Sequence, residues 1–154
     1  MIREATLKDV EKIVKIINES NYQAFRKIIP KEFFKYPITD ISMILKDMKE
    51  MKFYIYEVNS EVVGVAALKP DQEKKTGFIR WVYVAPKHQH KGIGTALIKH
   101  IEETAEKLNL KKLQLITPEK AIWAIKFYKK LGYKIVNYIQ AKAWKDVIME
   151  KDLK

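Results

Sequence analysis

Two of the five glycines in this 154-residue chain lie close together, in a loop whose backbone could bind phosphate. The loop and its continuation read Gln89, His90, Lys91, Gly92, Ile93, Gly94 and Thr95. A β-rich run precedes them and a helical pattern of apolar residues follows them. Glycine lets the backbone turn tightly, and the first N–H groups of a helix point outward with a partial positive charge. The pattern indicates either a phosphate-binding loop or a glycine turn that only starts a helix.

Other phosphate and metal motifs do not fit the chain. A dinucleotide fingerprint needs three glycines in G-x-G-x-x-G, and a Walker loop needs Gly-Lys followed by Ser or Thr. Neither pattern is present. The chain has no cysteine, and no histidines or carboxylates stand at ligand spacing, so the sequence gives no support for a metal site.

The elements that would position the loop alternate between strand and helix periods. Strands are predicted at Ile2–Ala5, Phe53–Val58, Val62–Leu68, Phe78–Val84, Leu113–Ile116, Tyr133–Ile139 and Val147–Met149. Helices are predicted from Leu7 for about three turns, from Ile41 to Met48, from Ile93 to Leu108 and from about Glu119 to Leu131. Residues 21–37 are typical of short helices and turns, and residues 70–75 of a loop. With no internal repeat or linker, this order predicts one α/β (α+β) domain over residues 1–154.

Composition limits the class of protein and its partners. The chain is 47% hydrophobic and has a net charge of +11, from 30 basic and 19 acidic residues. No apolar run reaches the roughly 18 residues of a membrane span, and the N-terminus lacks the pattern of a secretory signal, so a soluble, cytoplasmic protein without a membrane partner is expected. The lysines are scattered, which indicates either a solvated surface or a site for a polyanion. Nucleic acid is the less favoured polyanion, because its sites gather basic and aromatic residues.

At the glycine loop the chain resembles the GNAT superfamily of N-acetyltransferases. Its hallmark is Gln or Arg-x-x-Gly-x-Gly or Ala between the fourth strand and the third helix, matched here by Gln89, Gly92 and Gly94. A second family motif follows at residues 124–133, where Gly132 would end the helix as a left-handed cap. The resemblance covers nearly the whole chain. It implies the GNAT fold: a mixed sheet of six to seven strands, splayed between the fourth and fifth, with about four helices.

The resemblance also implies a reaction, with acetyl-CoA as the co-substrate. The N–H groups of residues 89–95 would hold its pyrophosphate, and the backbone around Val82, Tyr83 and Val84 would bond the pantetheine arm. A primary amine of a small molecule or peptide would attack the thioester directly in a ternary complex. Tyr128, which would also border the cofactor, stands where many relatives have the acid that protonates the thiolate. Its other interpretation is one more core aromatic.

The sequence leaves the general base open. Many relatives place a glutamate on the fourth strand, which has no carboxylate here. Relatives that acetylate protein N-termini often carry a glutamate twelve residues before the tyrosine and an asparagine seven before it, where this chain has Ile116 and Ala121. Glu73 and Glu119 could act through water, but both are typical of solvated surface charges. A non-catalytic basic module, which senses CoA or binds nucleic acid, is the alternative function.

Two further expectations concern partners. Aromatic residues between Tyr22 and Tyr36 fall in the segment that covers the acceptor site in the family, so they form either a wall for the substrate or ordinary core. Homodimers are common in the family, so a homodimer is a further expectation. Neither the acceptor amine nor its binding residues can be identified from these patterns.

Overall fold

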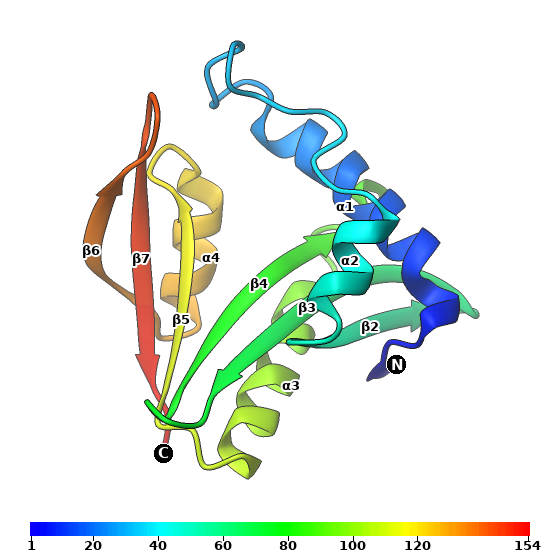
Figure 1. The fold of residues 1–154 in the computed structure, drawn as a ribbon, viewed down its shortest axis with the longest axis vertical. Coiled ribbons are helices and arrows are strands. Elements are labelled where there is room, and N and C mark those ends of the chain that lie inside the picture. Colours follow the sequence, from blue (N-terminus) through cyan, green and yellow to red (C-terminus); the bar gives the residue numbers. More distant parts are fainter.

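The centre of the molecule is a mixed sheet of seven strands in the order β1-β2-β3-β4-β5-β7-β6 (Figure 1). The computed structural model describes residues 1–154. The strands are β1 (Ile2–Glu4), β2 (Lys52–Val58), β3 (Glu61–Asp71), β4 (Thr76–Val84), β5 (Lys112–Pro118), β6 (Lys134–Gln140) and β7 (Lys145–Asp152). The α-helices are α1 (Val10–Phe25), α2 (Ile41–Asp47), α3 (Ile93–Lys107) and α4 (Ile122–Lys130), with short 3-10 turns at Leu7–Asp9 and Pro86–His88.

The two faces of the sheet bury two hydrophobic clusters. Strand residues alternate between the faces, so one set of β2–β4 side chains packs with α3 and the other with α1 and α2. The α3 cluster is the larger, with 18 buried residues, and it continues into β5, α4 and β7 through Leu115, Ile125 and Val147. The cluster under α1 and α2 has 12 buried residues, among them Phe53 and Trp81. One continuous apolar core therefore joins the two halves of the sheet.

The sheet splits between β4 and β5. This is the parallel pair in an otherwise antiparallel sheet, and it is short: Thr76, Gly77 and Phe78 pair with residues 112–114. Beyond Phe78 the strands diverge, and Figure 1 shows β4 and β5 as the two sides of a V with its vertex near the C-terminus. We call the β1–β4 side with α1–α3 the first arm, and the β5–β7 side with α4 the second arm.

Most predicted elements are confirmed, including the splay between the fourth and fifth strands and the number of helices. Four elements differ from the prediction by three or more residues at one end. Strand β7 runs from Lys145 to Asp152, beyond both ends of the predicted Val147–Met149. Helix α1 extends to Phe25 instead of ending after about three turns, because its buried face continues through Ser20 and Asn21. Strand β3 includes Pro70 and Asp71, which pair with the start of β4. Helix α4 starts at Ile122, later than Glu119. None of the α-helices is both long and apolar enough to span a membrane.

Candidate active site

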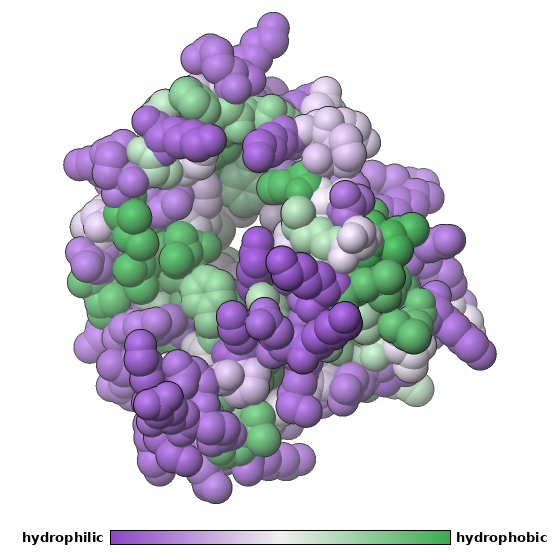
Figure 2. Space-filling model, viewed as in Figure 1, coloured by the Kyte–Doolittle hydropathy of each residue, from purple (hydrophilic) through white to green (hydrophobic).

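A cleft of about 1920 Å³ occupies the space between the two arms. Its walls come from β4, the loop after it and the start of α3 on one side, and from β5, α4 and the β6–β7 turn on the other. The segment after α1 contributes aromatic side chains at the mouth. In the space-filling view this region is an opening surrounded by both apolar and hydrophilic side chains (Figure 2). The splay of the sheet is the direct cause of the cleft, because β5 leaves one edge of β4 uncovered.

The uncovered edge of β4 carries backbone groups aimed at the cleft. The N–H of Ala85 donates to Val63 O on β3, and the direction of such groups alternates along an antiparallel strand. Tyr83 therefore faces β3, whereas Val82 and Val84 face the cleft. The carbonyl of Val84 accepts from the side chains of Ser20 (3.1 Å) and Gln89 (3.1 Å). The N–H and C=O of Val82 and the N–H of Val84 are left for a ligand that lies along β4 like an added strand.

A bulge at Trp81 bends β4 beside this edge. Trp81 has φ of 59°, in the left-handed region that a bulky residue rarely adopts, and the register between β3 and β4 shifts at this point. Its indole Nε1 donates to Asp47 Oδ2 on α2 at 2.8 Å, and the guanidinium of Arg80 lies over its ring at 4.4 Å. The side chain of Asp47 on α2 therefore holds the bulge in place, a contact that the sequence did not predict.

The loop at residues 89–95 presents seven consecutive N–H groups that have no hydrogen-bond partner inside the protein. His90 and Gly92 both adopt left-handed conformations, with φ of 65° and 82°. Left-handed residues turn the backbone of a loop so that successive N–H groups can converge on one point and favour an anion there. The N-terminus of the 15-residue helix α3 adds its partial positive charge. A diphosphate group therefore fits this loop.

Tyr128 lies across the cleft from the loop, on α4. Its ring is 8% exposed and packs edge-to-face against Phe127 and Tyr133, with centroids 5.0 Å and 5.7 Å away. Burial raises the pKa of its phenol above the ordinary value, with a smaller effect from Tyr83. The hydroxyl makes no hydrogen bond to the protein, yet the structure has no buried polar side-chain atom without a partner, so the hydroxyl reaches the accessible surface of the cleft. The hydroxyl of Tyr128 is therefore a protonated donor, and the packing of its ring fixes its position.

Aromatic contacts join the two arms on the α1 side of the cleft. Phe25 at the end of α1 meets Trp123 of α4 at 5.8 Å between ring centroids. Phe33, in the segment between α1 and α2, meets Trp144 of the β6–β7 turn at 6.3 Å. The amino group of Lys142 lies 5.9 Å from the centroid of the Phe33 ring. Phe25 and Phe33 therefore line the cleft, and their role as a wall for the substrate stays a prediction.

One carboxylate, Asp146 at the start of β7, lines the cleft. Its Oδ1 accepts a hydrogen bond from Trp144 Nε1 at 2.9 Å. Burial raises the pKa of Asp146, and the indole hydrogen bond partly opposes this. Glu73 and Glu119 are exposed and do not line the cleft. The sequence did not identify Asp146, because a single carboxylate at the start of a strand is not part of any recognisable motif.

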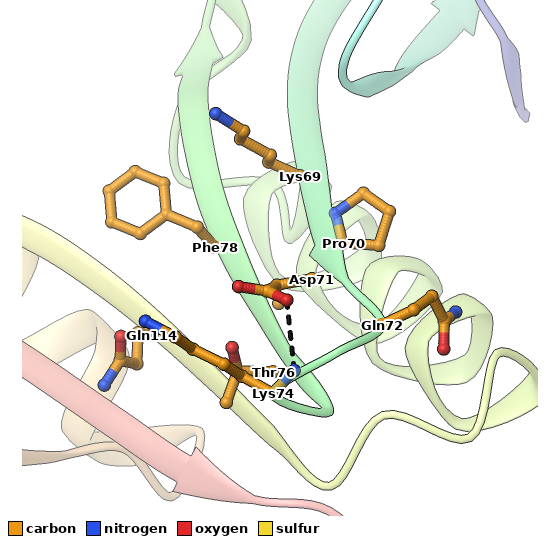
Figure 3. A pocket seen from close by; sticks show the side chains of 9 residues that line it. Lys69, Pro70, Asp71, Gln72, Lys74, Thr76, Phe78 and Gln114 are labelled. Atoms are coloured by element: carbon orange, nitrogen blue, oxygen red, sulfur yellow. Dashed lines mark hydrogen bonds between the residues drawn. The ribbon is translucent and has the colours of Figure 1, made fainter.

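A second, smaller hollow of about 430 Å³ lies beyond the vertex of the V, at the β3–β4 turn. Figure 3 shows its lining side chains, which include Lys69, Asp71 and Gln114. The carboxylate of Asp71 accepts from the backbone N–H of Lys74 at 3.1 Å, which stabilises the turn. Lys69 and Phe78 border both this hollow and the cleft. Its lining is polar, and its carboxylate has a structural partner.

All but one of the residues predicted for the site line the cleft. They are Val82, Tyr83, Val84, Gln89, His90, Gly92, Ile93, Gly94, Thr95 and Tyr128. Lys91 is exposed and does not line it. Tyr83 points its ring toward α1, where its hydroxyl accepts from Asn21 Nδ2 at 2.8 Å. No group of three or more His, Asp or Glu residues is placed to hold a metal ion.

Comparison with known proteins places this cleft in a wider family. The model of the acetyltransferase (GNAT) family matches residues 12–133. The S-(2-succino)cysteine N-acetyltransferase of Bacillus subtilis (strain 168) is 29% identical over 138 residues, which cover 85% of this chain and 82% of that protein. The amino-acid acetyltransferase of Ralstonia nicotianae is 31% identical over 125 residues, 81% of this chain but only 25% of that longer protein.

Solved structures share the fold over nearly the whole chain. The PaiA N-acetyltransferase of Thermoplasma acidophilum, in complex with coenzyme A, superposes with a TM-score of 0.87 at 22% identity, covering 99% of this chain and 98% of that one. The putative acetyltransferase yncA of Salmonella typhimurium, with acetyl-CoA, gives a TM-score of 0.78 at 21% identity, covering 100% and 94%. The seven-stranded sheet with its parallel β4–β5 pair is the GNAT fold, and the chain belongs to the GNAT family of acetyltransferases.

Proposed function

We propose that the protein is an N-acetyltransferase that transfers the acetyl group of acetyl-CoA to a primary amine of a small molecule or peptide. The observation that carries the proposal is the row of seven unpartnered N–H groups at residues 89–95, beside the open edge of β4. Backbone donors at a helix N-terminus suit a pyrophosphate, and an uncovered strand edge suits an amide-containing arm. Relatives of this fold have been solved with coenzyme A and acetyl-CoA.

The residues around the cleft would divide the work of direct transfer. Acetyl-CoA supplies the activated acyl group as a thioester. The N–H groups of Val82 and Val84 would serve as donors to the thioester oxygen as negative charge develops on it. Tyr128 would give its proton to the departing thiolate. Its raised pKa keeps the phenol protonated throughout the neutral range, at the expense of acid strength.

The relatives favour small acceptors. One carries the name of an N-acetyltransferase for S-(2-succino)cysteine and another that of an amino-acid acetyltransferase, and both names describe amines attached to compact, carboxylate-bearing molecules. The mouth of the cleft is narrowed by the Phe33–Trp144 contact, which favours a small molecule or an extended peptide end over a folded domain. We infer an acceptor of that size.

Two measurements test the proposal in order. Titration calorimetry should show binding of acetyl-CoA that is much tighter than binding of ATP, because ATP has phosphates but no pantetheine arm for the edge of β4. CoA release should then be detected with at least one member of a panel of polyamines, amino acids, aminoglycosides and peptides. No binding, or equal weak binding of both nucleotides, contradicts the proposal. Tight acetyl-CoA binding without CoA release across the panel indicates a CoA sensor instead.

A further inference from the structure

Asp146 differs from the other acidic side chains of the molecule by facing the cleft without a cationic partner. None of the ion pairs in the structure includes it. Its Oδ1 accepts from Trp144, while its Oδ2 has no hydrogen-bond partner in the protein. The side chain is half-buried, and desolvation of a carboxylate is costly unless a cation or donor compensates for it. Although the chain has a net charge of +11, this carboxylate is not paired with a lysine or arginine and can bind the cation of a ligand.

The register of the sheet places Asp146 level with the reacting part of β4. Phe78 and Gln114 form the last pair before the arms diverge. Four residues further along β5, about 13 Å from that pair, is Pro118; on β4 the bulge at Trp81 adds one residue, so Val82 lies about one residue short of the same height. Pro118 pairs directly with Asp146 of β7. Asp146 therefore lies on the second arm close to the height where Val82 offers its backbone on the first arm.

The surroundings of Asp146 suit an organic cation. Trp144, its hydrogen-bond partner, forms an aromatic pair with Phe33, and ring faces attract ammonium groups. The other charged side chains that line the cleft are cationic, including Lys35, Arg80, Lys126 and, beside Phe33, Lys142, and they repel an ammonium. An alkyl amine is protonated near neutral pH, with a pKa of about 10. Within this cleft only Asp146 offers such an amine a compensating charge.

We propose that Asp146 binds the acceptor as its ammonium ion and positions the nitrogen opposite the edge of β4, with Phe33 and Trp144 against the attached carbon atoms. One ammonium proton would pass to solvent in the cleft before the neutral nitrogen attacks, and the proton lost as the amide forms balances the one that Tyr128 would give to the thiolate. The inference rests on the proposed function and specifies the acceptor. It is an amine that enters the cleft as a cation and whose attached carbon atoms are apolar enough to pack against aromatic rings. Asp146 also explains how a site without a carboxylate on β4 can attract its amine.

The test compares Asp146→Asn with the wild type at saturating acetyl-CoA, using the acceptor that releases most CoA in the amine panel. Loss of a hydrogen bond to a charged group should raise the KM for the acceptor about 10- to 100-fold. The Kd for acetyl-CoA should change less than twofold, since the pyrophosphate loop is on the other arm. Asp146→Glu keeps the charge and should lie between the wild type and the asparagine variant.

Asp152→Asn is the matched control, because Asp152 is exposed at the other end of the same strand and does not line the cleft. It should leave both constants unchanged. An acceptor KM of Asp146→Asn within twofold of wild type overturns the inference and leaves the proposed function intact. A wild type that releases no CoA with any amine overturns both. If Asp146→Asn does not fold, an unchanged acceptor KM in Asp146→Glu overturns the inference instead, because the longer side chain displaces the charge.

Discussion

The hydroxyl of Tyr128 reaches the cleft while its ring packs against other aromatic rings, so removal of the hydroxyl separates a chemical role from a packing role. Tyr128→Phe keeps the ring that contacts Phe127 and Tyr133. We expect kcat to fall at least about tenfold, as for loss of a general acid, while the Kd for acetyl-CoA stays within about twofold. Tyr138→Phe, at an exposed position on β6, is the control. Unchanged turnover in Tyr128→Phe would show that the phenol only fills the core.

The hydrogen bond from Trp144 affects the pKa of Asp146, so its removal should change how activity depends on pH. The indole N–H of Trp144 lowers the pKa of Asp146 against the larger effect of burial, which raises it. Trp144→Phe keeps an aromatic ring but removes the donor, so the pKa of Asp146 should rise further. The acid side of the profile of kcat/KM for the acceptor should then move to higher pH than in the wild type.

Other charges do not produce this shift. Lys142 on the same turn and Lys35 on the segment after α1 line the cleft, yet neither pairs with Asp146 or alters its pKa. An acid limb that stays in place in Trp144→Phe would mean that the limb belongs to another group, with the acceptor amine itself as the first candidate.

At the scale of elements, the loop between β4 and α3 can be tested through its left-handed glycine. Gly92 has φ of 82°, and a Cβ added there would meet no atom within 4 Å. Gly92→Ala therefore strains the backbone without a clash, at about 1 kcal/mol, which lowers Tm by about 2 to 4 °C. Because relaxation of the loop redirects its N–H groups, we also expect a weaker Kd for acetyl-CoA.

Gly132 supplies a matched control for that strain. It has φ of 97° at the end of α4, away from the cleft lining, and an added Cβ would meet only the flexible side chain of Lys151. Gly132→Ala should lose a similar amount of stability and keep the acetyl-CoA Kd of the wild type. If both variants bind acetyl-CoA equally well, the N–H groups of the loop do not hold the pyrophosphate.

The elements also show which parts of the site could be read from the sequence. The turn at residues 89–95 could be predicted because the spacing of its glycines reflects the local backbone conformation, and its role in holding a pyrophosphate is a proposal. Tyr128 was found only through the motif around it. Asp146 and the Asp47–Trp81 contact depend on which strands pair, in which register, and on how far β4 and β5 diverge. No local sequence pattern encodes those distances, so the residues proposed to bind the acceptor could not be predicted from the sequence.

For the molecule as a whole, the net charge of +11 predicts how salt affects the affinity for acetyl-CoA. Screening shortens the range of electrostatic attraction to about 8 Å at 0.15 M salt, so the Kd for acetyl-CoA should rise several-fold between low and moderate ionic strength. Replacing Lys126 and Lys130, which line the cleft on α4, by glutamine should flatten that dependence.

Replacing Lys8 and Lys12 by glutamine removes the same charge from exposed positions outside the cleft. That variant should keep the salt dependence of the wild type. Equal flattening in both variants would mean that the general field of the protein, and not the lysines of α4, attracts the cofactor.

The aromatic contacts Phe25–Trp123 and Phe33–Trp144 affect how substrates could enter the cleft and products could leave it. They tie together the open ends of two arms that are already joined at the vertex, so the cleft is bounded on all sides and becomes a passage through the molecule. The loop at residues 89–95 lies toward the α3 side of this passage. The two aromatic contacts and Asp146 lie toward the α1 side. If acetyl-CoA binds at residues 89–95 and the acceptor at Asp146, as proposed, the two substrates would enter from opposite ends of the passage, and initial-rate kinetics should show no obligatory order of binding.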